Sequence, residues 1–476
     1  MRIAFIAVCL FSLSVSVEAR GHDPMSVDHL LSRMTFGATE EDRRHVAEVG
    51  VGPYIEEQLD PSSIDDHLLD ERLAALTTWR VATPPLIARF SPPKPQTPVV
   101  IPIDLPLCTG TSVLPAVISK TPAGGPQALV TELQRSAFLR AVYSRRQLYE
   151  RMVRFWENHF SVNVNKDADR FYLTSFDRDT IRPFALGSFR ALLGATAHSP
   201  AMLYYLDNWQ SGVAKGPLLG TPRRRSGGLN ENYARELLEL HTLGVKGGYT
   251  QRDVEEVARC FTGWTIYKVN DVGLFMFDPA QHDDGAKTVL GHTIPPGGGI
   301  ADGEIVLDIL AQHPSTAHFI ATKLARMLIS DDPPESVVRR AASVFLETHG
   351  SIAATVRSII TSREFADPRT YEAKVKSPFE YAVSAARLVG ADTDGGRPIL
   401  DWIARMGEPV FGRVTPDGYP DRANTWLSTG TLLERMNFAI ALANDQIVGT
   451  RYPKDPRDHD ATPVAYTIGS PKFQLR

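Results

Sequence analysis

The sequence predicts a mainly α-helical protein: a multi-helix globular body with a proline-rich excursion and a small β-hairpin. Apolar residues recur at helical spacing through most of the chain. Helix-start signals such as Thr39-x-x-Asp42 and Thr250-x-x-Asp253 accompany this spacing. Short β-prone runs around a turn occur near residues 274–291, and no repeat of about 20–50 residues is present.

Residues 1–19 have the pattern of a secretory signal peptide. A basic start at Arg2 precedes an apolar run from Ile3 to about Val17, followed by Val17-Glu18-Ala19, a small-x-small cleavage site. We expect cleavage after Ala19 and a periplasmic or secreted protein. No later stretch approaches about 20 apolar residues, so no transmembrane segment is expected after cleavage. A retained N-terminal membrane anchor is the alternative.

Composition narrows the classes of partner and site. The net charge is −4, with 51 Lys and Arg residues against 55 Asp and Glu residues, which gives no electrostatic case for nucleic acid. Cys108 and Cys260 remain after signal removal and could pair in an oxidising compartment. Cys260 lies in a helical pattern, so we expect a buried free thiol there. The absence of Cys-x-x-Cys argues against cysteine-based zinc and redox sites.

The first part of the mature chain divides into two regions. We predict an N-terminal helical region over residues 20–82, with helices between 26 and 80, the first of which Ser26 or Asp28 can open. Residues 83–126 contain eleven prolines and leave little room for regular helix or a central strand. We expect a loosely ordered connector, and the alternative is a lid over a site.

A main helical domain is predicted over residues 127–450. An early helix over 148–160 places His159 on its apolar stripe and Asn158 beside it. A histidine in such a stripe is typically a core residue bonded to a carbonyl, and the alternative is a catalytic role. The stripe consists of Leu148, Met152, Phe155, Trp156, His159 and Phe160.

The stretch from Asn230 to Gly244 predicts a capped helix that carries two carboxylates. Asn230 can accept a backbone N–H at the start, and Gly244 can end the helix in a left-handed conformation. At about 100° per residue, Asn232, Glu236 and Glu239 share one face. Neighbouring carboxylates can raise each other's pKa and serve as acid and base. The alternative is an exposed face in which Arg235 pairs with Glu239.

The predicted hairpin joins residues 274–277 to residues 287–290. Its loop carries His282 and Asp283, which could act as acid and base or hold a cation. The alternative is a polar turn. Helices follow from 303 to 391, one of them opened by Ser377-Pro378-x-Glu380. An irregular segment over 413–426, a helix over 431–445 and an irregular tail over 451–476 complete the chain.

Five segments in order resemble the bacterial family called domain of unknown function 1800. They are HLLSRMTFGAT (29–39), RMVRFWENHF (151–160), the run NENYARELLELHTLGVKGGYTQRDVEEVARCFTGW that starts at 230, FDPAQHDDGAKTVLG (277–291) and LLERMNFAIALA (432–443). The resemblance implies an exported protein without an assigned activity. Similar proteins are often encoded beside secreted sulfatase-like proteins, which suggests a partner of that kind.

Three functional hypotheses follow. The first is a hydrolase acting on an envelope or extracellular polymer, and the second is a non-catalytic envelope scaffold or partner-binding protein. The third is a metal-binding form of the first, built on His282 and Asp283, although the sequence assigns no complete metal site and no cofactor. An enzyme predicts that its candidates line one pocket. The catalytic candidates are Glu236, Glu239, His159 and His282; the substrate-binding candidates are Asn158, Asn232, Arg235, Trp264 and Asp283.

Overall fold

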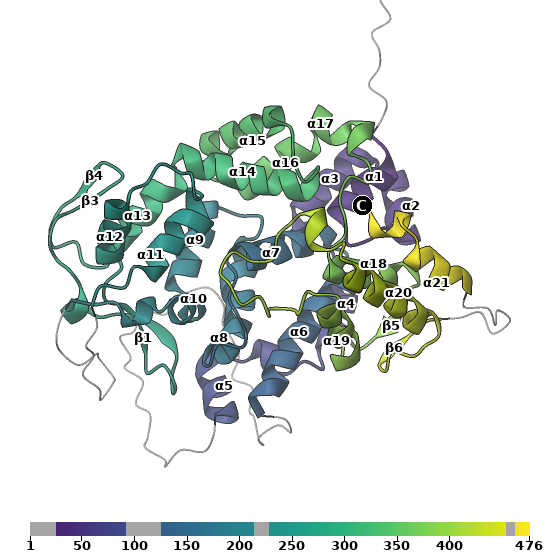
Figure 1. Cartoon of the computed structure of the whole chain (residues 1–476), viewed down its shortest axis with the longest axis horizontal. Helices are drawn as coiled ribbons and strands as arrows, with labels where there is room; N and C mark the ends of the chain where they lie inside the picture. Colours follow the sequence, from purple (N-terminus) through teal and green to yellow (C-terminus); the bar gives the residue numbers. More distant parts are fainter. Residues whose placement is uncertain (1–24, 92–124, 214–227, 454–461) are drawn as a thin grey trace, which may run out of the picture.

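The computed structural model describes residues 25–91, 125–213, 228–453 and 462–476. The predicted signal peptide, Cys108 and most of the proline-rich connector lie outside these residues. Within them, helices predominate and the strands form three two-stranded antiparallel sheets (Figure 1). The mainly α-helical fold class is therefore confirmed.

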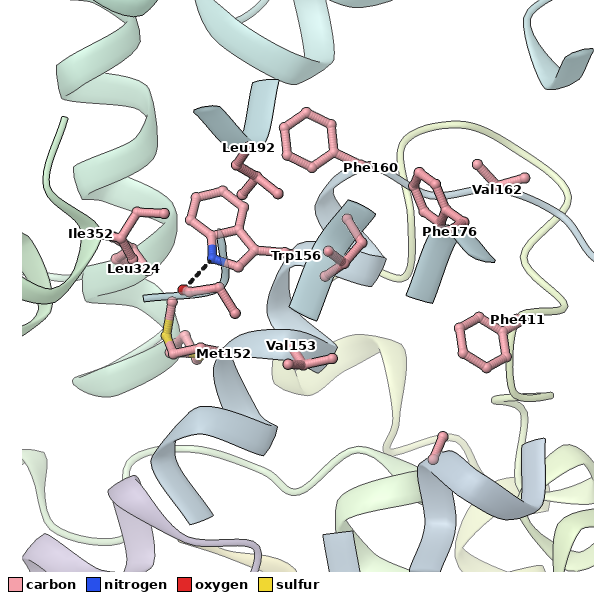
Figure 2. Packing of buried hydrophobic residues seen from close by; sticks show 14 of the residues in the cluster. Met152, Val153, Trp156, Phe160, Val162, Phe176, Leu192, Leu324, Ile352 and Phe411 are labelled. Atoms are coloured by element: carbon pink, nitrogen blue, oxygen red, sulfur yellow. Dashed lines mark hydrogen bonds between the residues drawn. The ribbon is translucent and has the colours of Figure 1, made fainter. Parts of the chain in front are cut away.

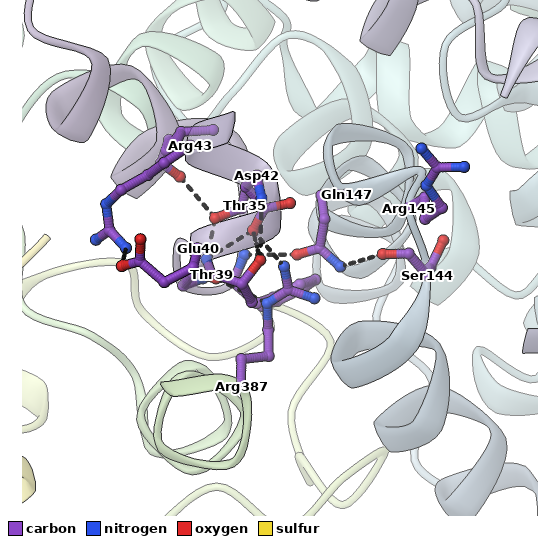
Figure 3. Close-up of polar contacts among 12 residues, drawn as sticks. Thr35, Thr39, Glu40, Asp42, Arg43, Ser144, Arg145, Gln147 and Arg387 are labelled. Atoms are coloured by element: carbon purple, nitrogen blue, oxygen red, sulfur yellow. Dashed lines mark hydrogen bonds and ion pairs between the residues drawn. The ribbon is translucent and has the colours of Figure 1, made fainter. Parts of the chain in front are cut away.

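The N-terminal region is helical, as predicted. Thr39 and Asp42 form a complete capping box, and Arg387 reaches the Asp42 carboxylate from a distant helix at 2.8 Å (Figure 3). The predicted connector begins with a regular helix, α5 (Thr83–Phe90), because Pro84 and Pro85 occupy its first turn, where their missing N–H groups are not needed. The helices are α1 (Val27–Met34), α2 (Glu40–Val49), α3 (Val51–Leu59), α4 (His67–Leu73) and α5 (Thr83–Phe90).

Helix α7 (Gln147–His159) runs through the middle of the molecule (Figure 1). Its apolar side packs Met152, Val153 and Trp156 into the core, and the Trp156 indole N–H donates to the Ala185 carbonyl at 2.9 Å (Figure 2). The neighbouring helices are α6 (Gly125–Tyr143), α8 (Asp169–Ser175), α9 (Phe189–His198), α10 (Pro200–Tyr205), α11 (Asn232–Glu236) and α12 (Gln251–Cys260).

Strand pairing differs from the predicted hairpin. The runs at 274–277 and 287–289 are strands, but they do not pair with each other. Each pairs with a strand nearer in sequence, because a tighter connection brings that strand alongside first. The sheets are β1 (Trp264–Tyr267) with β2 (Leu274–Phe277), β3 (Lys287–Val289) with β4 (His292–Ile294), and β5 (Asp392–Thr393) with β6 (Thr450–Arg451).

The C-terminal half returns the chain to α7 and α1. The tail predicted to be irregular contains helix α21 (Thr462–Gly469). The last residue of the tail, Arg476, forms an ion pair with Glu380 of α18 (Pro378–Leu388) at 3.1 Å. The helices are α13 (Ala301–Ala311), α14 (Pro314–Leu328), α15 (Glu335–Glu347), α16 (Ile352–Ile360), α17 (Arg363–Ala366), α18 (Pro378–Leu388), α19 (Arg397–Arg405), α20 (Thr429–Ala443) and α21 (Thr462–Gly469).

One continuous cluster of buried apolar side chains extends from Leu30 to Ile468. The N-terminal helices and the chain end therefore belong to the same core as α7 and α14. Cys260 lies in this core, and burial raises the pKa of its thiol to about 12. None of the described helices is long and apolar enough to cross a membrane.

Candidate functional site

A cavity of about 340 Å³ opens between α7, α14, the start of α18 and the segment 417–426. We call it the Lys323 cleft. Helical spacing brings its side chains together, because α7 and α14 each present residues at i, i+3 or i+4, and i+7. They are Arg151, Arg154, Phe155 and Asn158 from α7 and Phe319, Lys323, Arg326 and Met327 from α14, joined by Phe36, Leu240, Ser377, Phe379, Glu380, Glu408, Asp417, Tyr419, Pro420, Asp421, Arg422, Trp426 and Arg476.

Asn158 fixes the irregular segment against α7. Its side-chain N–H donates to the Tyr419 carbonyl at 2.8 Å, and its Oδ1 accepts from the Tyr419 N–H at 2.6 Å. Gly418 has φ +71°, and a Cβ there would lie 2.1 Å from the Asn158 carbonyl oxygen. The segment can approach α7 this closely only with glycine at 418. Asn158, predicted to bind substrate, thus lines the cleft and also positions Tyr419.

Lys374 anchors the same segment a few residues further along. Its buried ammonium contacts Asp331 at 2.7 Å and Asp421 at 2.6 Å. The second Asp331 oxygen accepts from the Ala423 N–H at 2.7 Å. Two anchors, one at Tyr419 and one at Asp421–Ala423, therefore hold an irregular wall in a defined place.

Lys323 and His159 form the central polar contact of the cleft. Lys323 Nζ lies 2.8 Å from His159 Nδ1, and His159 Nε2 lies 3.0 Å from the His241 carbonyl oxygen. Burial, with the nearby Arg326 charge, lowers the pKa of Lys323 to about 8. Burial, with the charge of Lys323, lowers the pKa of His159 well below its ordinary value. His159 is therefore neutral at pH 7.

A π-helical turn presents the carbonyl of His241. The predicted regular helix from Asn230 ends after Glu236, and a π-helical turn covers Leu237–Thr242. The Thr242 hydroxyl donates to the Leu237 carbonyl at 2.6 Å across this wider turn. Burial lowers the pKa of His241 to about 3, so its ring is neutral beside Phe160. Gly244 has φ +82°, as predicted for the helix end. Asn230 accepts the Asn232 N–H, but it lies one residue before the N-cap, Glu231, which has no side-chain cap.

Two carboxylates in the cleft differ in their environment. Burial alone would raise the pKa of Glu380, but Arg476 and Arg151, each 3.1 Å away, lower it to about 2. Burial raises the pKa of Glu408, against the weaker opposing effect of Arg154 at 3.6 Å. One Glu408 oxygen accepts the Phe379 N–H at 2.9 Å. Glu380 is thus a fixed anion, whereas Glu408 is the more basic carboxylate.

Glu236 and Glu239 lie near the cleft but are not among its lining residues. Burial, followed by the Glu239 charge, raises the pKa of Glu236, as expected for adjacent carboxylates. The charge of Asp417, which does line the cleft, acts in the same direction. Arg235 contacts Glu231 at 3.2 Å and Glu239 at 3.7 Å, and Asn232 is exposed. This helix face therefore lies beside the site, and its charges are partly paired.

The structure places the hairpin candidates in a separate buried network. His282 contacts the Thr262 carbonyl at 2.8 Å and Asp302 at 3.2 Å, and Asp302 pairs with Lys287 at 2.5 Å. Asp283 pairs with Arg259 at 2.8 Å. Trp264, also a candidate, is fully buried. These residues are not in the Lys323 cleft, and no group of three or more potential metal ligands gathers within the described ranges.

A family model described as protein of unknown function (DUF1800) matches residues 29–473. The chain belongs to the DUF1800 family. No curated protein matches this DUF1800 chain. No solved structure matches it either.

Sequence reasoning about this DUF1800 protein missed Lys323, Glu408 and the arginines that line the cleft. Lys323 falls between Ile320 and Met327 at i+3 and i+7, so a lysine on a mostly apolar flank was the available signal. Glu408 follows a helix end and has no periodic pattern around it. Of the predicted residues, Asn158 lines the cleft and His159 contacts it through Lys323.

Proposed function

We propose that this DUF1800 protein is an exported hydrolase that cleaves an envelope or extracellular polymer in the Lys323 cleft by general acid–base catalysis. The observation that carries the proposal is the contact between Lys323 Nζ and His159 Nδ1 inside a cavity of about 340 Å³. A cavity of this size falls in the usual range for ligand sites. A lysine with a pKa of about 8 is charged at pH 7 yet releases its proton readily.

The hydrogen-bond pattern assigns the proton positions. A carbonyl oxygen can only accept, so neutral His159 carries its proton on Nε2 and bonds to the His241 carbonyl. His159 Nδ1 is then an acceptor, and Lys323 must donate to it. One ammonium proton of Lys323 is thereby fixed, which orients the others. We assign Lys323 as the general acid and His159 as its positioning residue.

Glu408 is the proposed general base. Burial raises its pKa, which makes its ionised form a better proton acceptor than an ordinary glutamate. In the proposed step, Glu408 removes a proton from water as the water oxygen bonds to the electrophilic carbon of the substrate. The bond to the leaving oxygen breaks, and Lys323 gives that oxygen a proton. Exchange with solvent then restores both groups.

Aromatic side chains supply the surface for the non-reacting part of the substrate. Phe155, Phe319, Tyr419 and Trp426 line the cleft. Aromatic faces favour the apolar faces of sugar or peptide units, and the ordered wall at Tyr419 presents one such face in a fixed place.

The test combines turnover with a direct measurement on Lys323. Lys323→Met should lower product release from a panel of envelope and extracellular polymers by about 10²- to 10⁴-fold, and wild-type activity should fall above pH 8 as Lys323 deprotonates. Competitive acetylation followed by mass spectrometry should give Lys323 a midpoint near pH 8. Exposed Lys472 is the control: Lys472→Met should leave turnover unchanged. Full activity of Lys323→Met would refute the assignment.

A partner-binding role is the second candidate, and one observation favours it. Leu433, Met436 and Ile440 form a stripe on α20 and are 57, 55 and 50% exposed. Exposed apolar stripes of this kind mark protein interfaces. The sulfatase-like secreted protein suggested by the family resemblance is a candidate partner. If the protein acts only as a scaffold, Lys323→Met should retain its function in cells.

A further inference from the structure

We infer that the Lys323 cleft binds an oxyanion of its substrate, a carboxylate, phosphate or sulfate group, between Lys323 and Arg326. The inference takes from the proposed function only the location of the ligand. It adds the chemical class of the substrate, which carries a negative group; if Lys323 is also the general acid of the proposed function, this group lies close to the bond that is broken.

The first observation is a pair of cations without matching anions. Lys323 and Arg326 lie one turn apart on α14 and both line the cleft. Neither forms an ion pair with a described residue: Lys323 bonds to neutral His159, and Arg326 Nε donates to the Asp331 carbonyl at 3.0 Å. Their repulsion contributes to the lowered pKa of Lys323. A bound anion would relieve this repulsion.

The carboxylates of the cleft compensate this pair only in part: the charges of Asp421 and Asp417 act on Lys323 without an ion pair, and every carboxylate of the cleft is already paired with another cation. Glu380 lies between Arg151 and Arg476 and forms ion pairs with both, so it forms none with Lys323 or Arg326. The ion pairs are Glu380 with Arg151 and Arg476, Glu408 with Arg154, Asp417 with Arg413, and Asp421 with Lys374, which also pairs with Asp331. The acidic residues are therefore largely neutralised within the protein itself.

Two buried arginines beside the cleft, Arg33 and Arg151, have N–H donors without a hydrogen-bond partner within the described ranges, and their charges add to the positive charge of this region. Arg33 is 0% exposed, and its Nε and Nη1 have no hydrogen-bond partner in the part of the chain that the structure describes. Arg151 lines the cleft, and its Nε likewise has no hydrogen-bond partner among the described residues. Burial, with the charges of Arg476 and Arg151, lowers the pKa of Arg33. Buried cations without compensation are costly, and a nearby anion offsets that cost.

A second cavity, of about 480 Å³, lies next to the Lys323 cleft and shares four lining residues with it. Phe36, Arg151, Glu380 and Arg476 line both cavities. The Arg151–Glu380–Arg476 cluster, with two cationic side chains and one anionic side chain, thus borders both spaces. An extended anionic polymer would meet a favourable potential beyond the reacting unit as well.

The test measures binding of inorganic phosphate, sulfate and acetate at constant ionic strength, with chloride as the balancing salt. At least one ion should raise the Tm of the wild-type protein and shift the acetylation midpoint of Lys323 upward from pH 8. Arg326→Gln should weaken that binding at least about tenfold. Preference for phosphate and sulfate over acetate would identify a tetrahedral group, and the reverse a carboxylate.

Two variants keep the outcome decisive. Arg339→Gln, on the exposed side of α15, should bind the ion as the wild type does, and equal weakening by both arginine variants would overturn the site. Lys323→Arg keeps the charge but cannot serve as a ready proton donor. It should bind the ion and lose turnover. Binding with full turnover would refute the catalytic role alone, whereas turnover without any ion binding would refute the anion site alone.

Discussion

At the residue scale, the cleft depends on side chains that fix one another. His159 was expected either as a core histidine bonded to a carbonyl or as a catalytic residue. It is buried and bonded to the His241 carbonyl, and its other nitrogen meets Lys323 at the cleft. The same side chain can therefore stabilise the core and orient a functional group, because imidazole has two distinct nitrogens.

Gly418 is the residue on which the wall of the cleft most directly depends. Gly418→Ala should destabilise the protein by at least about 2 kcal/mol, because alanine is strained at φ +71° and its Cβ would displace the Tyr419 bonds to Asn158. Urea unfolding monitored by circular dichroism measures this loss. Gly430→Ala is the control, since Gly430 lies in α20 with no atom within 4 Å of an added Cβ. A loss equal to that of the control would contradict the argument.

At the element scale, the π-helical turn shows how one wider turn changes which residues share a helix face. The expected face of Asn232, Glu236 and Glu239 assumed about 100° per residue throughout. The turn at Leu237–Thr242 breaks that geometry after Glu236 and buries His241. Such turns are rare and recur at functional sites. Here the turn directs a carbonyl to His159.

The network of His282, Asp302 and Lys287 ties β3 to α13. Asp302→Ala should cost about 3–5 kcal/mol, because it leaves the buried Lys287 ammonium without its carboxylate. Asp308→Ala on the same helix should cost less than about 1 kcal/mol, since Asp308 is an exposed partner of Arg190. Chemical denaturation compares the two variants. Similar losses in both would show that the buried network contributes nothing special.

At the scale of the whole molecule, buried neutral histidines make stability depend on pH. Burial lowers the pKa of His29 to about 4, that of His241 to about 3 and that of His159 well below its ordinary value. The unfolded chain therefore binds more protons than the folded one below about pH 6.5. The stabilisation that these neutral histidines contribute is fully present above that pH and is lost as the pH falls toward their folded-state pKa values.

Each such histidine should contribute a slope of up to about 1.4 kcal/mol per pH unit. His29→Asn should accordingly flatten the decline between pH 6 and pH 5, measured by urea unfolding, because His29 no longer takes up a proton on unfolding. His67→Asn, at an exposed position, should keep the wild-type slope. Buried Asp169 and Glu157, whose pKa values are raised, act in the opposite direction, so the comparison must be made between variants. An unchanged slope in His29→Asn would reject the account.

The sequence by itself determined the helical class and the capping boxes at Thr39, Thr250 and Ser377, and it placed Asn158 and His159 among the residues to test. These features depend on spacing along a few turns, which periodicity and capping rules describe. The strand partners and the path of the chain around Glu236 were predicted less well, because pairing and a π-helical turn respond to distant packing.

Only the tertiary structure decided the site. Lys323 is separated from His159 by 164 positions, and Tyr419 from Asn158 by 261. The charge balance of the cleft, with four carboxylates in ion pairs and with Lys323 and Arg326 in none among the described residues, exists only once α7, α14, α18 and the segment 417–426 have packed together. A pKa depends on burial and on nearby charges, and neither is a property of local sequence. The sequence therefore identified a neighbourhood, and packing converted it into a cleft with defined chemistry.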